Sequence, residues 1–149
     1  MTEDSQATLE KMYNEQQMAE TNLALLQQRI EVVQVYLTNY RSGLVVLEEI
    51  ERRKEGEEML MNIGGSIFVQ ANLADKDKVL RGIGNGVRIE QSVSDTKTAI
   101  TESIKKLEEQ LDSLTQDYQK LYAYSTQLNS QFQQLAAQMQ AARKPVEEE

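Results

Sequence analysis

The chain has 149 residues, 40% of them hydrophobic and only 5% aromatic, and it carries a formal net charge of −8. This composition favours narrow apolar seams over one large core, and the evenly spread acidity argues against nucleic acid and anionic lipid as partners. Cysteine and histidine are absent, which excludes a disulfide framework, a thiolate zinc site and imidazole chemistry.

The first predicted element is a helix over residues 5–54, where glycine occurs once and proline not at all. Apolar residues recur there in alternating steps of three and four, which is the heptad pattern of a coiled coil. The seam positions are Leu9, Met12, Gln16, Ala19, Leu23, Leu26, Ile30, Val33, Leu37, Tyr40, Leu44, Leu47 and Glu51. Residues 1–4 show no signal-peptide pattern, so we expect a cytoplasmic protein.

The segment 55–93 changes period and holds six of the seven glycines. Met59, Met61 and Ile63 alternate with other residues before Gly64-Gly65, and a second alternating run follows from Ile67. We predict a hairpin turning at Gly64-Gly65, and a second hairpin turning at Gly84-Asn85-Gly86. Two small hairpins cannot enclose a core alone, so this segment is predicted to be an assembly domain.

A second helix is predicted over residues 94–143, capped by Ser94 or Ser92. Its seam positions are Ile100, Ile104, Leu107, Leu111, Leu114, Tyr118, Leu121, Ser125, Leu128, Phe132, Leu135, Met139 and Ala142. The stretch 121–142 has no charged residue but six glutamines, too polar for a membrane span. Residues 144–149 form an acidic tail, either solubilising or a contact for another protein, and Pro145 follows the helix end.

Both seams run over 43 positions, from Leu9 to Glu51 and from Ile100 to Ala142. Equal lengths favour an antiparallel pair within one chain, with Glu51 near Ile100 and Leu9 near Ala142. Pairing of each helix with another chain is the alternative. The predicted fold is therefore mainly α with small β: a long antiparallel coiled-coil hairpin joined to two β-hairpins.

The order of these elements and two central motifs resemble archaeal-type prefoldin subunits of the alpha class. The motifs are Met59-Leu60-Met61-Asn62-Ile63-Gly64-Gly65-Ser66-Ile67-Phe68-Val69 and Val79-Leu80-Arg81-Gly82-Ile83-Gly84-Asn85-Gly86-Val87. Two hairpins rather than one indicate the alpha rather than the beta class. Asn62 stands where many family members have a proline.

The resemblance implies a heterohexamer of two alpha-class and four beta-class subunits, whose hairpins form a β-barrel body. Its coiled-coil arms would hold unfolded client proteins without ATP and pass them to a group II chaperonin. The alternative is a structural spacer or a filament-forming prefoldin-like subunit without client transfer. No cofactor, metal or enzyme activity is expected, because all the clustered acidic residues except Glu51 lie off the seams and Gly82 to Gly86 precedes a predicted strand rather than a helix.

Two sets of candidate site residues follow. The client-binding set lies at the free end of the coiled coil, where low charge and flexible methionines favour contact with varied chains. It comprises Met1, Leu9, Met12, Tyr13, Phe132, Leu135 and Met139, which alternatively only hold the helices together. The subunit-assembly set comprises Met61, Ile63, Ile67, Val69, Ala71, Leu80, Ile83, Val87 and Ile89, with Gly64, Gly65, Gly84, Asn85 and Gly86 as turn residues.

Overall fold

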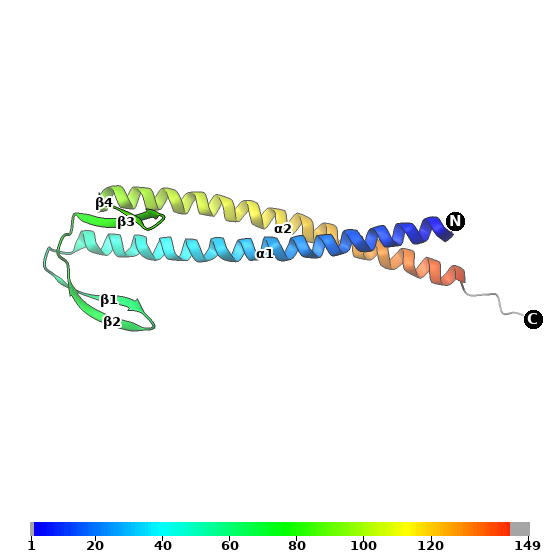
Figure 1. Cartoon of the computed structure of the whole chain (residues 1–149), viewed down its shortest axis with the longest axis horizontal. Helices are drawn as coiled ribbons and strands as arrows, with labels where there is room; N and C mark the ends of the chain where they lie inside the picture. The colour runs from blue at the N-terminus through cyan, green and yellow to red at the C-terminus, as the bar shows by residue number, and fades with distance from the viewer. Residues whose placement is uncertain (1, 144–149) are drawn as a thin grey trace, which may run out of the picture. The chain divides into compact units, whose positions relative to one another are not determined.

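A computed structural model describes residues 2–143 as two helices with four strands between them (Figure 1). The elements in order are α1 (Thr2–Arg52), β1 (Glu58–Gly64), β2 (Ile67–Asn72), β3 (Lys78–Gly84), β4 (Val87–Ser92) and α2 (Val93–Arg143). Met1, Pro145 and the acidic tail lie outside the described residues. The predicted combination of long helices and small hairpins is confirmed.

The chain divides into two compact units. We call the part formed by residues 1–33 and 110–149 the terminal unit, and the part formed by residues 34–109 the hairpin unit. Each contains a stretch of α1 and a stretch of α2, and all four strands belong to the hairpin unit.

In the hairpin unit the two helices run antiparallel. Lys97 Nζ lies 2.8 Å from Glu51 Oε2, and Arg41 Nη2 lies 2.7 Å from Glu108 Oε1. The seam residues Leu47 and Ile104, between these bridges, are buried, as is Leu37 one turn before Arg41. The pairing within one chain is thereby confirmed, and Glu51 lies within one turn of its expected neighbour Ile100.

The terminal unit repeats this antiparallel arrangement. The Gln16 side-chain amide donates a hydrogen bond to Asn129, and the seam residues Ala19, Ile30, Val33 and Leu128 are buried. Extending the Gln16–Asn129 pairing by seven residues to Leu9 leads to residue 136, about one and a half helical turns before Ala142. The expected pairing of Leu9 with Ala142 is therefore wrong, because seam length alone does not determine the register of two helices.

A small core joins the hairpins to the helices of the hairpin unit. Leu47, Ile50 and Val93 are buried there, and Met59, Leu73, Val79 and Ile100 pack against them. Ile50 and Val93 lie outside the heptad seam and are buried because the hairpins cover them. Burying such side chains stabilises a fold by about 1.5–3 kcal/mol each.

Polar contacts define where each helix meets the strands. At the end of α1, Arg53 contacts the Glu49 carboxylate at 2.7 Å and donates a hydrogen bond to the Glu58 carbonyl, which ties the helix to β1. At the start of α2, the Ser92 hydroxyl accepts a hydrogen bond from the Asp95 backbone N–H at 3.0 Å. Of the two serines considered, Ser92 is therefore the cap.

The first hairpin turns one residue later than predicted. Gly64 pairs with Ile67, so the two-residue loop is Gly65-Ser66, with φ of +58° and +60°. The register shifts between Asn62 and Gly64, which marks a β-bulge. This extra residue displaces the turn, and the Asn62 side chain accepts a hydrogen bond from the Gly64 N–H at 2.8 Å.

The second hairpin has the same backbone pattern. Gly84 pairs with Val87, the loop is Asn85-Gly86, and the register shifts between Gly82 and Gly84. Both loop residues have positive φ, +48° and +75°, as a type I′ turn requires.

Gly43 is the one glycine within the two helices. Apart from its chain neighbours and the nearby backbone of α1 itself, no described heavy atom lies within 4 Å of the position that a Cβ would occupy there. A close helix contact is thereby excluded as the reason for this glycine.

Candidate functional site

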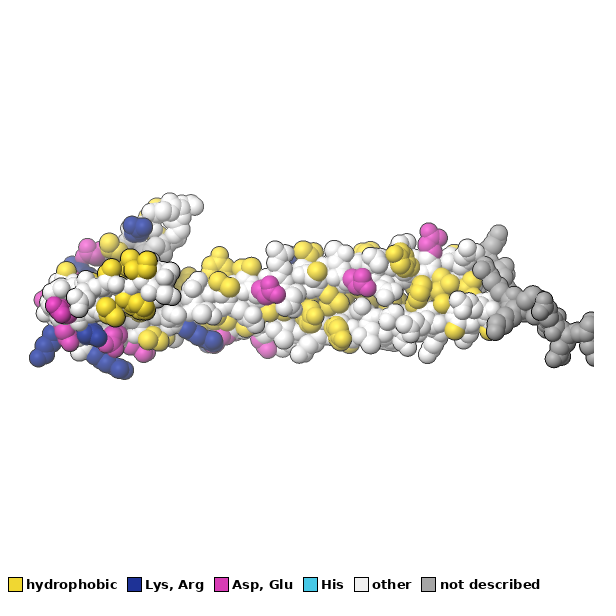
Figure 2. Space-filling model, turned by 90° about the horizontal axis from the view of Figure 1, so that it is seen from below, with side chains coloured by type: hydrophobic (Ala, Val, Ile, Leu, Met, Phe, Trp, Pro, Cys, Tyr) yellow, Lys and Arg dark blue, Asp and Glu magenta, His cyan; other side chains and the backbone are white. Residues whose placement is uncertain are grey.

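The terminal unit carries an uncharged surface along the second half of α2. Residues 121–142 include glutamine, serine, threonine, asparagine and alanine, but no charged side chain. Figure 2 shows a face of the molecule on which uncharged and hydrophobic side chains predominate in this unit, whereas Lys, Arg, Asp and Glu gather around the hairpins. A chain that contacts residues 121–142 therefore displaces water from few ions.

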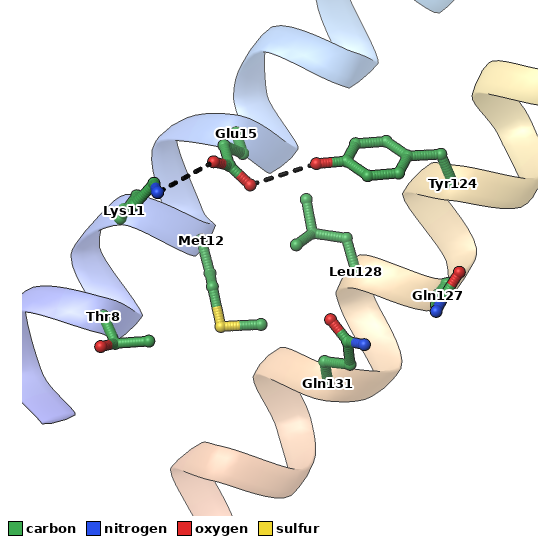
Figure 3. A pocket seen from close by; sticks show the side chains of 8 residues that line it. All are labelled: Thr8, Lys11, Met12, Glu15, Tyr124, Gln127, Leu128 and Gln131. Carbon is green, nitrogen blue, oxygen red and sulfur yellow. Dashed lines mark hydrogen bonds and ion pairs between the residues drawn. The ribbon is translucent and has the colours of Figure 1, made fainter.

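An open cavity of about 410 Å³ lies between α1 and α2 of the terminal unit (Figure 3). Its lining residues are Thr8, Lys11, Met12, Glu15, Tyr124, Gln127, Leu128 and Gln131. The Met12 and Leu128 side chains lie between the two helices, with polar groups around them. The cavity thus combines an apolar centre with a mostly neutral rim.

The charged groups of this rim neutralise one another. Lys11 Nζ lies 3.9 Å from one Glu15 oxygen, and the Tyr124 hydroxyl donates a hydrogen bond of 3.1 Å to the other. That hydrogen bond, and then the charge of the same carboxylate, raises the pKa of the Tyr124 hydroxyl above 10.0. Tyr124 is therefore a neutral donor at physiological pH.

The expected client-binding residues fall into three groups. Met12 is half-buried and lines the cavity. Leu9, Phe132, Leu135 and Met139 are half-buried without lining it, and Tyr13 is 52% exposed. Met1 lies outside the described residues. Of the six expected residues that the structure describes, Met12 alone lines the cavity.

Several lining residues were not anticipated by sequence reasoning. Tyr124, Gln127 and Gln131 lie beside the seam of α2 rather than in it, and Leu128 is a seam position outside the expected client-binding set. The uncharged run was the available signal, because Gln127 and Gln131 lie within it four residues apart, on one face of a helix.

A second, similarly open cavity of about 360 Å³ lies in the same unit. Its lining residues are Asn22, Leu25, Leu26, Arg29, Asp117 and Leu121. Leu25 is exposed, as are Met18 and Val32, each seven residues away along α1. An apolar stripe therefore follows one side of α1 in the terminal unit.

In the hairpin unit, the predicted assembly residues are mostly exposed. Met61, Ile63, Ile67, Val69, Leu80, Ile83 and Val87 are exposed, and Ala71 and Ile89 are half-buried. The two hairpins form separate two-stranded sheets, so the outer edge of each strand has no strand beside it among the described residues. Exposed apolar faces and open edges are typical of a surface that another chain covers.

The other face of the first hairpin carries two further apolar residues. Leu60 and Phe68 are 64% and 54% exposed, and their pairing partners, Gln70 and Asn62, are polar. They are diagonal neighbours on one face, opposite the face of Met61 and Val69. The first hairpin is therefore apolar on both faces.

Two kinds of chemical site were sought among the described residues: a metal-ligand cluster and a phosphate loop. In the described part of the chain, no three carboxylates gather closely enough to hold a metal ion. The glycine-rich stretch from Gly82 to Gly86 leads into strand β4, so it lacks the helix N-terminus of a phosphate loop. Within residues 2–143, neither helix combines the length and the apolarity needed to cross a membrane.

Comparison with known proteins gives consistent relatives. A family model described as "Prefoldin subunit" matches residues 19–138. The chain is 30% identical over 124 residues to "Prefoldin subunit alpha" of Archaeoglobus fulgidus, covering 83% of this chain and 88% of the relative. It is 26% identical over 134 residues to "Prefoldin subunit alpha" of Methanobrevibacter smithii, covering 90% and 91%.

A solved structure shares the fold. The cryo-EM structure of filamentous PFD from Methanocaldococcus jannaschii superposes with a TM-score of 0.64 at 24% identity, and the match covers 79% of this chain and 98% of that chain.

Proposed function

Because this chain belongs to the prefoldin family of chaperones, we propose that it is the alpha-class subunit of an ATP-independent cytoplasmic holdase. It captures unfolded proteins on its terminal unit and delivers them to a group II chaperonin. The cavity around Met12 and Leu128, beside the uncharged stretch of α2, is the observation that carries the proposal.

The physical case rests on adaptable apolar contact at low desolvation cost. Met12 has a flexible, polarisable side chain that packs against many partner shapes. Leu9, Phe132 and Met139 are half-buried, so small movements of the helices expose more apolar surface. The neutral rim leaves few ions to strip of water when a client segment enters.

Assembly supplies the strength that one weak contact lacks. The exposed hairpin faces are suited to contacts with beta-class subunits in a hexamer of two alpha-class and four beta-class chains. Several terminal units then hold one client together, and linked weak sites combine into tight binding. The hairpin residues thus contribute to client capture indirectly.

The test is light scattering from a chemically unfolded model protein that is diluted, without ATP, into the assembled complex. Intact chains are compared with chains shortened to residues 24–127. The shortened chains lack Leu128, Gln131 and all the α1 residues that line the first cavity, including Met12. Met12→Gln is the point variant. Val35→Gln is its matched control, since Val35 is an exposed apolar residue of α1 in the hairpin unit.

We expect intact chains and Val35→Gln to suppress aggregation, Met12→Gln to do so less well, and shortened chains to fail. Size-exclusion chromatography must show equal assembly of all versions. If intact chains do not suppress aggregation, the holdase proposal is wrong. Delivery is tested separately, by transfer of a labelled client to a group II chaperonin.

The alternative function is a spacer or filament subunit without client transfer. The open strand edges favour it, since they permit end-to-end addition of further copies. Electron microscopy of the chain alone distinguishes the two: filaments without holdase activity would support the alternative.

A further inference from the structure

A row of glutamines follows the cavity side of α2. Gln127, Gln131, Gln134 and Gln138 are spaced by four, three and four residues, which places them on one face of the helix. Gln127 and Gln131 line the cavity (Figure 3). All four are exposed, and within residues 2–143 none of their side chains makes a hydrogen bond.

The chemistry of this row matches an extended backbone. Each amide offers two donors and an acceptor without a charge, so one glutamine can bond both a peptide N–H and a peptide C=O. The row repeats on average about every 5.5 Å along α2. Backbone groups on one edge of an extended chain repeat about every 6.6–6.8 Å, a difference that flexible glutamine side chains can span.

The charges around the cavity determine which kind of peptide segment can bind there. The α2 side of the cavity has no ionised group, and on the α1 side Lys11 and Glu15 neutralise one another. A charged side chain that entered there would lose water without gaining a free counter-ion. Neutral segments complement this surface, and helical segments do not, because their backbone groups are already paired.

Resting on the proposed holdase function, we propose that the terminal unit selects neutral, extended segments of unfolded chains. Apolar side chains of the segment enter the cavity beside Met12 and Leu128. Backbone amide and carbonyl groups of the same segment exchange hydrogen bonds with Gln127 and Gln131, and a longer segment continues along Gln134 and Gln138.

The experiment measures binding of labelled peptides to the assembled complex by fluorescence anisotropy. Two neutral peptides carry the same apolar side chains; one is flexible, and the other is locked as a helix by a hydrocarbon staple. We expect the flexible peptide to bind about tenfold more tightly, the equivalent of one or two net hydrogen bonds. A third peptide, flexible with a central lysine or glutamate, is expected to bind more weakly than the neutral flexible one.

A double variant separates hydrogen bonding from apolar contact. Gln127→Leu with Gln131→Leu makes the cavity more apolar, yet we expect it to bind the flexible peptide about tenfold more weakly and to lose the preference for it. The matched control, Gln133→Leu with Gln140→Leu, changes glutamines of the same helix that do not line the cavity, and it is expected to keep the preference. Circular dichroism checks that both remain helical.

The outcomes separate this inference from the proposed function. If the cavity double variant binds the flexible peptide as tightly or more tightly, while aggregation is still suppressed, the row is only a solvated face and the inference is wrong. Equal binding of stapled and flexible peptides would also overturn it. If neither peptide binds and aggregation proceeds, both the inference and the holdase proposal are wrong.

Discussion

The two hairpins of the hairpin unit share one backbone conformation but differ in the side chains on their surfaces. Glu58 pairs with Asn72 in the first, and Lys78 pairs with Ser92, 20 positions later, in the second. In each hairpin the register shifts just before the last paired glycine, Gly64 in the first and Gly84 in the second. Each then turns through two residues of positive φ. The backbone form therefore depends on the few residues around the turn.

The surfaces differ at equivalent positions. Phe68 of the first hairpin corresponds to Arg88 of the second, and Met61 corresponds to Arg81. The second hairpin also carries an exposed ion pair, with Lys78 Nζ 3.0 Å from Glu90 Oε1. Turn chemistry sets the shape of a hairpin, and strand side chains decide whether water or another chain covers its faces.

The largest expected effect tests whether the two backbones are equivalent. Gly64→Val and Gly84→Val place a β-branched side chain at φ of +104° and +113°, where it is strained. We expect each to destabilise its own hairpin by about 2–3 kcal/mol, measured by hydrogen exchange of the strand amides. The control is Gly82→Ala, where φ is not positive and the added methyl meets open space. Markedly unequal losses would contradict the equivalence.

The next effect tests the difference between the faces. Phe68→Arg gives the first hairpin the residue of the second, and we expect it to weaken assembly with a beta-class partner by about 2 kcal/mol, as for an interface hot spot. Arg88→Phe is the reciprocal change. We expect it to alter the dissociation constant of assembly by less than about threefold, a difference under 1 kcal/mol. Analytical ultracentrifugation measures both. Equal losses would mean that the two faces are covered alike.

A smaller effect exchanges the second residue of each turn. Ser66 has φ of +60°, which costs a non-glycine residue about 1 kcal/mol. Ser66→Gly is therefore expected to stabilise the first hairpin, and Gly86→Ser to destabilise the second, each by up to about 1 kcal/mol. Hydrogen exchange reads both out, and changes of the same sign would refute the explanation.

The smallest effect is the pH response of the Lys78–Glu90 pair. The hydrogen bond that Lys78 donates to the Glu90 carboxylate, and then the charge of that carboxylate, raises the pKa of Lys78 above 10.5. Since the folded pKa is raised, the contribution of this pair is present below about pH 10.5 and is lost as pH rises through the folded pKa. In the Glu90→Gln variant, an NMR titration should show the pKa of Lys78 moving back toward 10.5. No movement would show that the pair is not formed.

Sequence periodicity was sufficient where many residues support one pattern. The long seams predicted both helices and their antiparallel pairing, because Leu37, Leu47, Ile104 and Leu128 lie where the heptads place them. Their register was not predictable, since a one-turn shift leaves leucine facing leucine. The same reasoning accounts for the misplaced Leu9–Ala142 pairing.

Local features were harder to predict because single residues decide them. A bulge adds one residue without changing the alternation of a short strand, so the first turn was placed at Gly64-Gly65 instead of Gly65-Ser66. Phe68 was not expected in the assembly set, because it is out of phase with the alternating apolar residues Ile67, Val69 and Ala71. Gln127 and Gln131 were missed because glutamine is also an ordinary residue of solvated helices.

The separation of 20 positions between equivalent residues of the two hairpins has an evolutionary consequence. One such interval contains a complete hairpin with its link, so duplication or loss of this interval in the gene adds or removes a whole hairpin. The strands that remain keep their pairing, and the heptad positions of both helices are unchanged. Deletion of one such interval would therefore convert this two-hairpin chain into a chain with one hairpin.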